Sequence, residues 1–489
     1  MKKEKTNIKK RISLLLAFLA VLSMTACGGN TATDDTTKDD AADTSVSTDT
    51  ETEVHAEPSI VELLGAKDLS GAAYIVLECN GSHFQVNIPG EELTGEAVND
   101  ALIHRDAFIE ETYNVVVDYI NMTESEGMSA LQNSVKAGDN AYNLVIGQIF
   151  DLAAQVNGQY LFNMMDLPYV EIDKAWYSPL MAESLSLDGH MYFTASDICP
   201  SVYHAPCCMF LNLKLYEDFG ITTDIYQSVI DGKWTLDQLI SLQKDIDRDL
   251  NEDGKLTAAE DFFGVAQQPT LETATAFLSG ANASFCVKDG ATLSMGGVNE
   301  RTIGIMEKLA SFCQNITFKD INDVIFYCFK EDKALFLQHK LESAASNLRD
   351  MESDYLVLPS PKADETQDHY ISMLSGYCRS YIGISATAEP EFTGFVTEAL
   401  ARYSHENIRP LAFDMVYKDK TSRDPRTSEV LDILLDNLYI DFGIVYNFDG
   451  VNDLAVNFIY KDQPFISNYE KKKEAIAASI EKTIKAWTE

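Results

Sequence analysis

The sequence predicts an α/β fold divided into two lobes. From residue 72 onward, short apolar segments typical of strands alternate with amphipathic segments typical of helices. A second stretch of the same kind begins near residue 200. About 430 of the 489 residues follow a polar N-terminal segment, which is enough chain for two lobes that each have a hydrophobic core.

The first region predicts a sheet built from βαβ units. Its segments alternate as strand, helix, strand, helix, strand and helix over residues 72–79, 96–113, 114–120, 127–138, 142–148 and 151–158. Strands that are separated by helices favour parallel neighbours, so a mostly parallel sheet is expected. A turn followed by a strand is expected over residues 187–196.

The second region predicts another α/β arrangement. A buried strand and a helix closed by Gly220 are expected over residues 205–220. Further strands are expected at 261–268, 354–361 and 380–386. Further helices are expected near residues 235–247, 271–279, 298–314, 330–337, 390–404, 424–437 and 467–489.

Residues 1–26 have the pattern of a secretory signal. The basic start MKKEKTNIKKR precedes the apolar run ISLLLAFLAVLSM, which is too short for a comfortable membrane span. The sequence TACGG then resembles a bacterial lipobox, which predicts a diacylated (palmitate-type) cysteine at Cys27 and cleavage just before it. An ordinary cleaved signal with an incidental cysteine is the alternative. Residues 27–57, rich in Thr, Asp and Ala, predict a disordered acidic tether to a folded domain over residues 58–489.

Acidic side chains outnumber basic ones by two to one. The chain has 38 Lys and Arg and 76 Asp and Glu, for a net charge of −38. Loss of residues 1–26, which hold six Lys and Arg and one Glu, would make the net charge −43. Such a charge argues against nucleic acid and anionic membrane surfaces as partners, which leaves the lipid anchor as the expected contact with the membrane.

The cysteines after Cys27 do not have the pattern of a disulfide framework. No two of these eight form a CxxC motif, and several lie in apolar runs such as VIFYCF and APCCMFL. They are expected to be small buried hydrophobic residues, with a Cys286–Cys313 bridge left open.

Four stretches carry a resemblance to a known family. They are NDALIHRDAFIEETYNVVVD, YNLVIGQIFDLAAQVNGQYLFNMMDLP, MFLNLKLYEDFGI followed by DGKWTLDQL, and FKEDKALFLQHKLESAASNLRDMESDYLVLPSPK. In this order, and behind a lipobox, they resemble the extracellular solute-binding proteins of carbohydrate ABC importers, the maltodextrin-binding-like family. The resemblance spans about residues 72 to 489.

This resemblance implies a periplasmic-binding-protein-like fold, with two α/β lobes, crossover hinge strands and a ligand cleft between the lobes. Lobe 1 is expected to hold roughly residues 70–195 plus a later segment. Lobe 2 is expected to hold roughly residues 200–370 plus the C-terminal helices. Closure of the lobes around a ligand would be a hinge motion that a membrane permease senses.

The resemblance also implies where ligand-binding side chains lie, namely in loops that follow strands or cross between the lobes. Planar donors and acceptors for sugar hydroxyls, and aromatic rings for sugar faces, are expected at Asn80, Gln148, Asp151, Tyr203, His204, Gln338, His339, Tyr377 and Arg379. Core packing is the expected role of Tyr446 and Phe448, with stacking on a sugar as the alternative. Trp234 and Trp487 are expected to pack on helices, and Trp176 to lie at the cleft rim.

Residues 249–260 fit the calcium-binding loop of an EF-hand. Oxygen ligands are expected from Asp249, Asn251, Asp253, Lys255 (through its carbonyl), Thr257 (through water) and Glu260, with Gly254 at the sharp turn. A helix with a Thr235–Gln238 capping box precedes the loop and a strand follows it, so a paired sensor EF-hand is not expected. The sequence predicts a structural calcium ion in lobe 2, and a solvated acidic turn is the alternative.

The expected function is a lipid-anchored receptor on the outer face of the cell membrane. It would capture a carbohydrate and deliver it to the permease subunits of an ABC importer, acting as a monomer. The sequence shows no GxSxG, HExxH or P-loop signature, so an enzyme is not expected. The alternatives are a receptor for peptides or another solute, a surface glycosidase, and a sensory partner of a membrane kinase or a surface adhesin.

The calcium prediction can be checked by melting residues 58–489 with calcium and with a chelator. Because calcium would bind only the folded chain, its removal is expected to lower the melting temperature while sugar binding survives. An unchanged melting temperature would mean that the loop is only a turn.

Overall fold

The computed structural model describes residues 64–80, 87–244, 246–250, 252, 260–313, 321–412 and 424–488. The described residues all belong to one compact unit, within residues 58–489. The signal segment, Cys27 and the tether therefore lie outside the described residues. Within the described part, no helix is both long enough and apolar enough to cross a membrane.

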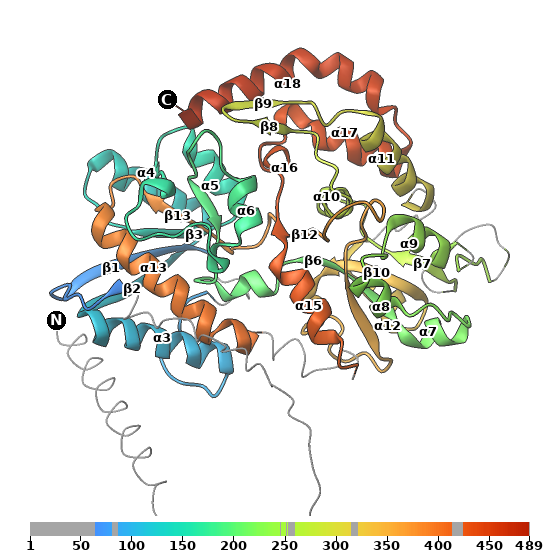
Figure 1. The fold of residues 1–489 in the computed structure, drawn as a ribbon, viewed down its shortest axis with the longest axis horizontal. Coiled ribbons are helices and arrows are strands. Elements are labelled where there is room, and N and C mark those ends of the chain that lie inside the picture. The colour runs from blue at the N-terminus through green and yellow to red at the C-terminus, as the bar shows by residue number, and fades with distance from the viewer. Residues whose placement is uncertain are drawn as a thin grey trace, which may run out of the picture. The chain divides into compact units, whose positions relative to one another are not determined.

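A six-stranded sheet forms the centre of lobe 1 (Figure 1). Its strands lie in the order β2, β1, β3, β13, β4, and β5 also pairs with β13. Their bounds are β1 Ala72–Cys79, β2 Val115–Met122, β3 Leu144–Gly147, β4 Leu161–Phe162, β5 Phe193–Ala195 and β13 Tyr381–Ser385. The first three strands are parallel, as predicted, but β13 runs against β3, β4 and β5. The chain enters β13 at the edge where β3 ends, so the expected mostly parallel sheet is limited to three strands.

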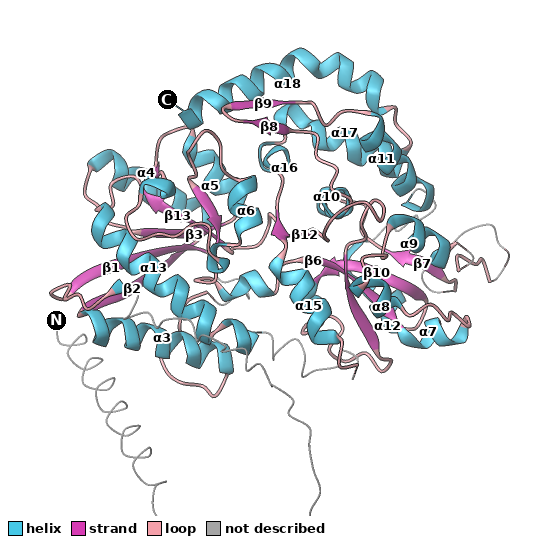
Figure 2. Cartoon of the chain, in the orientation of Figure 1, coloured by secondary structure: helices cyan, strands magenta, loops and turns pink. Residues whose placement is uncertain are grey.

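Helices cover both faces of this sheet (Figure 2). They are α3 Ala97–Tyr113, α4 Glu124–Ala137, α5 Ile149–Val156, α6 Pro179–Ser184 and α13 Pro390–Asn407. Tyr74 of β1 belongs to a hydrophobic cluster with residues of α3 and α13, whereas Leu77 belongs to a second cluster with residues of α4 and α5. Successive side chains of a strand point to opposite faces, so β1 is apolar nearly throughout.

A four-stranded sheet forms the centre of lobe 2, in the order β11, β6, β10, β7. The strands are β6 Cys207–Asn212, β7 Phe263–Ala266, β10 Ala334–Lys340 and β11 Tyr355–Pro359. β6 runs antiparallel to β10 and β11, and β10 runs parallel to β7. The surrounding elements are α7 Leu213–Asp218, α8 Ile225–Ile230, α9 Leu236–Gln243, α10 Leu271–Gly280, the hairpin β8 Val287–Asp289 and β9 Thr292–Ser294, α11 Glu300–Cys313, α12 Ile321–Lys330 and α15 Thr427–Asp436.

The expected helix at residues 330–337 is wrong. The helix α12 ends at Lys330, Asp332 has a left-handed backbone with φ of 54°, and the chain continues as β10. Leu335, Phe336 and Leu337 are all fully buried, because helices cover both faces of this central strand. A short apolar run of this kind has no periodicity that separates a buried strand from a buried helix.

The expected capping box at the start of α9 is only half formed. The backbone N–H of Gln238 donates to Thr235 Oγ1 at 3.3 Å, so Thr235 caps the helix. The Gln238 side chain donates to Ser228 Oγ at 3.1 Å and does not return to the Thr235 backbone. The Gln238 side chain, which a capping box would use, therefore binds α8.

Three segments meet where the two lobes join. Pro206 forms an antiparallel bridge with Leu374, and the Ser375 N–H donates to the Ala205 carbonyl at 3.1 Å. The short strands β12 (Ser372–Met373) and β14 (Leu438–Tyr439) pair in parallel beside this bridge. These backbone hydrogen bonds fix the crossover strands that the sequence predicts.

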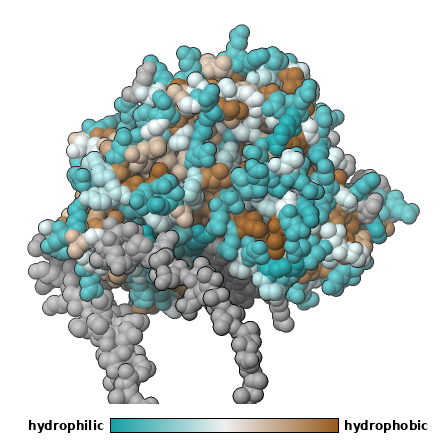
Figure 3. Space-filling view, in the orientation of Figure 1, coloured by the Kyte–Doolittle hydropathy of each residue, from teal (hydrophilic) through white to brown (hydrophobic). Residues whose placement is uncertain are grey.

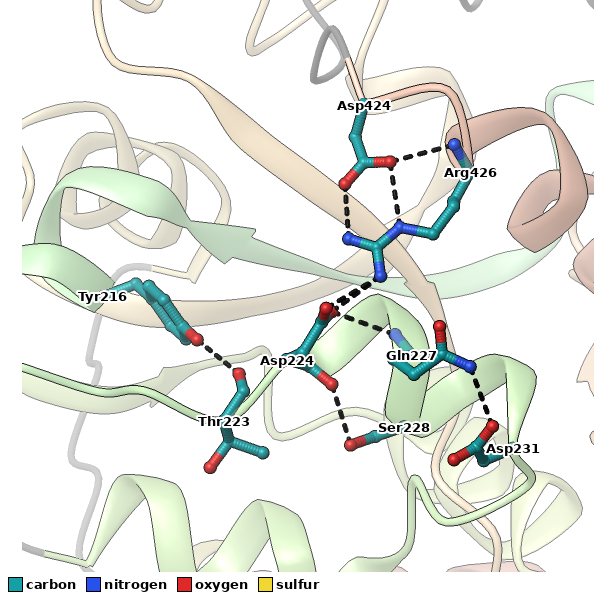
Figure 4. A network of polar contacts seen from close by, with 8 residues as sticks. All are labelled: Tyr216, Thr223, Asp224, Gln227, Ser228, Asp231, Asp424 and Arg426. Carbon is teal, nitrogen blue, oxygen red and sulfur yellow. Dashed lines mark hydrogen bonds and ion pairs between the residues drawn. The ribbon is translucent and has the colours of Figure 1, made fainter.

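An ion-pair network attaches the start of α15 to lobe 2 (Figure 4). Arg426 donates to both carboxylate oxygens of Asp224, at 3.0 and 2.8 Å, and to Asp424 at 2.6 Å. Asp224 also caps α8, by accepting the Gln227 N–H at 3.1 Å. The guanidinium lies over the ring of Tyr226, so Arg426 fixes the return of the chain to lobe 2 by packing as well as charge.

The C-terminal part consists of α16 Phe442–Tyr446, α17 Val451–Lys461 and α18 Phe465–Thr488. In the described part of the chain, all eight cysteines after Cys27 are buried and unpaired, so Cys286 and Cys313 do not form a bridge. Hydrophilic residues cover most of the face seen in Figure 3, in keeping with the high net charge.

Helix α4 approaches β1 so closely that Gly127 has no room for a side chain. A Cβ at Gly127 would overlap Cys79 Sγ and would lie 3.3 Å from Cys79 Cβ. This contact sets the position of α4 above the carboxyl end of β1.

We expect Gly127→Ala to lower the free energy of unfolding by about 1–3 kcal/mol, because the added methyl group overpacks the α4–β1 contact. The matched control is Gly304→Ala in α11, where a Cβ would meet nothing within 4 Å. That change is expected to stabilise the protein by about 0.5–1 kcal/mol through helix propensity. Urea melts of both variants measure the difference, and equal effects would contradict the close packing.

Candidate functional site

The carboxyl ends of the parallel strands in both sheets face the junction of the lobes. In lobe 1, Gly147 at the end of β3 pairs with Tyr381, the first residue of β13. In lobe 2, Lys340 at the end of β10 pairs with Cys207, the first residue of β6. Both β13 and β6 begin directly after crossover segments, so the loops after β1, β3, β7 and β10 meet the crossovers. Open α/β sheets bind ligands at such edges.

Arg379 and Gln148 share one carboxylate at this edge. The Arg379 guanidinium forms an ion pair with Glu124 Oε1, and the Gln148 amide donates to the same oxygen at 2.7 Å. Glu124 is the first residue of α4, and Gln148 is the residue just before α5. The network therefore ties the second crossover to the starts of two helices in lobe 1.

An aromatic pair lies beside this network. The rings of Phe150 and Tyr377 are 5.1 Å apart, and Tyr377 is 46% exposed. A Cβ at Gly376 would lie 2.6 Å from the Phe150 ring, so glycine is needed where the crossover passes Phe150. The Tyr377 N–H donates to Ser375 Oγ at 3.3 Å, and that hydroxyl donates to Glu272 of α10. Tyr377 is thus tied to lobe 1 through its ring, and to Glu272 of lobe 2 through its backbone N–H and the Ser375 hydroxyl.

Two buried polar residues lie at the end of β1. Glu78 is 1% exposed, and the side-chain amide of Asn80 donates to it at 3.4 Å. Burial raises the pKa of Glu78 to about 7, although Asn87, Asn80 and the nearby charge of Arg379 oppose this rise. Asn87 also donates to the Arg379 carbonyl at 2.7 Å, which supports the backbone that carries the guanidinium.

Asp151 completes an acidic group around Arg379. It lies in the first turn of α5, where carboxylates are favoured by the helix dipole. Its pKa is raised by burial and by the charge of Glu124, and is lowered by Arg379. The structure therefore brings five of the predicted ligand-binding residues to one edge, namely Asn80, Gln148, Asp151, Tyr377 and Arg379.

Tyr203 and His204 lie on the first crossover, just before β6. Tyr203 is 2% exposed, and its pKa is raised by burial and by the charge of Asp197. The His204 carbonyl accepts the Glu342 N–H at 2.7 Å, and burial lowers the pKa of its ring. Both residues pack inside the junction.

Gln338 and His339 lie within β10, whereas the sequence places them after a segment that ends at Leu337. Gln338 is 2% exposed in the middle of the sheet. His339 Nδ1 is 2.7 Å from Ser343 Oγ, and its ring packs edge-on against Phe326. Burial lowers the pKa of His339 to about 4, so this imidazole is neutral at physiological pH.

The three tryptophans are buried. Trp176 is 4% exposed and donates to Glu398 at 2.9 Å, so the expectation that it lies at the cleft rim is wrong. Trp234 is fully buried and donates to the Pro359 carbonyl at 2.9 Å. Trp487 packs with Tyr446, which stacks on Phe448, so these two rings serve the core and not the ligand edge.

The described ends of the predicted calcium loop are close together. Arg248 and Phe262 pair in both directions, at 3.1 and 3.2 Å, which closes the loop between α9 and β7. The Leu250 N–H also donates to Asp261 at 2.9 Å. Asp249 and Glu260 are described. The other predicted ligands, Asn251, Asp253, Lys255 and Thr257, lie outside the described residues. The carboxylate, amide and carbonyl oxygens of this set suit calcium chemically.

Glu124 and Phe150 are the main site residues that the sequence analysis missed. Both lie in the first turn of a helix that follows a parallel strand, as Asp151 does. The rule that ligand edges follow strands applies to them equally. Glu124 was hidden by the polar sequence TESEG, which also fits a helix cap.

Neither a protein-family model nor a curated protein matches the chain. Solved structures do resemble it. A maltose-binding periplasmic protein of Listeria monocytogenes, in complex with maltose, is 13% identical with a TM-score of 0.51, over 85% of this chain and 97% of that one. A cyclo/maltodextrin-binding protein complexed with maltotetraose is 14% identical with a TM-score of 0.52, over 85% and 96%.

At this identity the likeness shows the fold, which is the two-lobed periplasmic-binding-protein-like fold that the sequence predicts. Both structural neighbours are described as binding proteins and hold carbohydrate ligands.

The titration of Glu78 predicts how stability depends on pH. Its folded pKa of about 7 lies above the unfolded value of about 4.5, so the stabilisation is present below pH 4.5 and is lost as the pH rises through 7. We expect Glu78→Gln to remove this loss, so that the variant gains roughly 1–3 kcal/mol over the native chain between pH 5 and pH 8. Urea melts at both values measure it. Glu398, whose pKa is also raised to about 7, is present in both proteins and cancels. Parallel pH profiles would show that Glu78 keeps an ordinary pKa.

Proposed function

We propose that this protein is a receptor that captures a carbohydrate between its two lobes. The observation that carries the proposal is the exposed ring of Tyr377 beside the Arg379–Glu124–Gln148 network, at the edge where both sheets end. A sugar has an apolar face of C–H groups and a rim of hydroxyls. An aromatic ring suits the face, and fixed carboxylate, amide and guanidinium groups suit the hydroxyls.

The proposed role goes beyond binding to delivery. A receptor with two lobes and a hinge can present its ligand-bound form to the permease subunits of an ABC importer. Support for this step comes from the fold and from the sequence resemblance. The same resemblance supports a monomer that binds without chemical turnover.

We also propose that Cys27 carries the lipid anchor and that residues 27–57 are the tether. The lipobox-like TACGG sequence and the polar, acidic composition that follows it support this. The protein would then stand on the outer face of the cell membrane, held by acyl chains.

The loop at residues 249–260 is proposed to bind a structural calcium ion. The closed ends of the loop and its place in lobe 2, between α9 and β7, support a role in stability. None of the five residues gathered at the ligand edge belongs to this loop.

A thermal-shift screen of residues 58–489 against mono- and oligosaccharides tests the receptor. A sugar at about 100 times its dissociation constant should add roughly 2.7 kcal/mol of stability. Tyr377→Ala is expected to weaken the binding of that sugar roughly tenfold, about 1.4 kcal/mol, because it removes the stacking ring. Titration calorimetry measures the dissociation constant.

Tyr327→Ala is the matched control. Tyr327 is 46% exposed, as Tyr377 is, but it lies on α12, away from the junction of the lobes. Its affinity should equal that of the native chain. If only peptides or other solutes raise the melting temperature, the carbohydrate assignment is wrong and the receptor binds that ligand class. If the protein hydrolyses a glycoside, it is an enzyme and the proposal of a receptor is wrong.

A further inference from the structure

The C-terminal helices and the β8–β9 hairpin make contacts with both lobes. On the lobe 2 side, α17 packs against α10 and α11. The first residue of α18, Phe465, stacks on Phe285, which lies just before the hairpin, with the ring centres 5.4 Å apart. On the lobe 1 side, α16 packs against α5, and two further residues make specific contacts.

Lys288 of β8 is the first of these residues. Its ammonium donates to the carbonyls of Glu183, Ser184 and Ser186, at 2.7 Å for Ser184 and 2.8 Å for Ser186. These carbonyls lie at the end of α6 in lobe 1, where the helix leaves carbonyl groups without intrahelical partners. All three donors of the ammonium are therefore used on lobe 1. Burial lowers the pKa of Lys288, which agrees with an ammonium enclosed by the two elements.

Trp487, near the end of α18, is the second. Its ring is fully buried and packs edge-on against Tyr192, at 5.1 Å, and Phe193, at 5.8 Å, in lobe 1. The Tyr192 hydroxyl donates to the Trp487 carbonyl at 3.0 Å, and the indole N–H donates to Tyr446 at 2.6 Å. The last turn of the chain is thereby held on β5.

A change in the angle between the lobes must strain or break these contacts. The helices α17 and α18 follow lobe 2 through α10, α11 and Phe285. In contrast, β5 belongs to the sheet of lobe 1, and α6 packs against β5. Both contacts can also reverse. When the Lys288 ammonium and the carbonyls separate, water hydrates both. The free-energy cost of separating them is therefore much lower than the cost of leaving a charge buried and unpaired.

We propose that Lys288 and Trp487 form a latch that holds the two lobes in the arrangement seen in this structure. The latch does not depend on which ligand the receptor takes, and it acts without ligand. It makes the hinge a two-state element, with the lobes either latched or free to move apart.

Small-angle X-ray scattering of unliganded residues 58–489 tests the latch, using Lys288→Met and Trp487→Leu. Each variant is expected to raise the radius of gyration by a few per cent, above the value of about 22 Å for a compact chain of this size. Lys288→Met keeps most of the side-chain stem and removes only the charge and its donors. Tyr192→Phe is the mildest variant, since it removes one hydrogen bond to Trp487 and retains the ring, and it should give a smaller rise.

Lys233→Met is the matched control, because the ion pair of Lys233 is with Asp231, two residues away, and does not connect the two lobes. Its scattering should equal that of the native chain. Unchanged scattering for Lys288→Met and Tyr192→Phe, with cooperative melting that shows both are folded, would overturn the latch. The measurement contains no sugar, so a failed carbohydrate screen would leave it unaffected.

Discussion

The backbone pairing of the crossover segments is the constraint on which the rest of the molecule depends. Residues 205–206 pair with residues 374–375, and β12 pairs with β14 beside them. Both β6 and β13 start from this pairing, so it fixes the direction in which each sheet leaves the junction. The carboxyl ends of the parallel strands in both lobes therefore face one place. These hydrogen bonds, together with the hydrophobic cluster that both lobes share, bring the two sheets together, so loops from distant parts of the sequence can form one site.

The charged groups at this junction then determine which ligands it can bind. Arg379 lies among the carboxylates of Glu78, Glu124 and Asp151, and its ion pair with Glu124 also orients Gln148. Hydrogen bonds that involve a charged partner are short and directional, so the amide and guanidinium are fixed before any ligand arrives. The aromatic pair of Phe150 and Tyr377 adds an apolar surface to this polar group. Fixed polar groups beside an exposed ring suit a ligand that has an apolar face and polar groups close to each other.

The sequence predicted the parts of the structure that local patterns decide. Strand β1 was expected over its observed residues, because helices cover both of its faces and its apolar run is bounded by polar turns. Strand β10 was mistaken for a helix, since a short run that is apolar on both sides has no period. At the site, Gln148 and Arg379 were predicted from their positions at a strand end and a crossover, but the Glu124 carboxylate that they share in the structure was not. Which side chains point inward, as those of Gln338 and Tyr203 do, is set by tertiary packing that no local pattern records.

The hydrophobic core shows why motion of the lobes would need a special device. The cluster that contains Leu77 and Ile149 in lobe 1 continues without a break to Phe210 and Phe263 in lobe 2. Apolar packing of this density resists sliding, because any gap that opens loses its contacts on both sides. Any bending would therefore be confined to the peripheral contacts of the junction, where polar groups can exchange their protein partners for water. Lys288 on carbonyl groups is a contact of this exchangeable kind, whereas the aromatic packing of Trp487 makes the same boundary costly to open. A hinge that combines the two can hold the lobes in this arrangement and still be reversible.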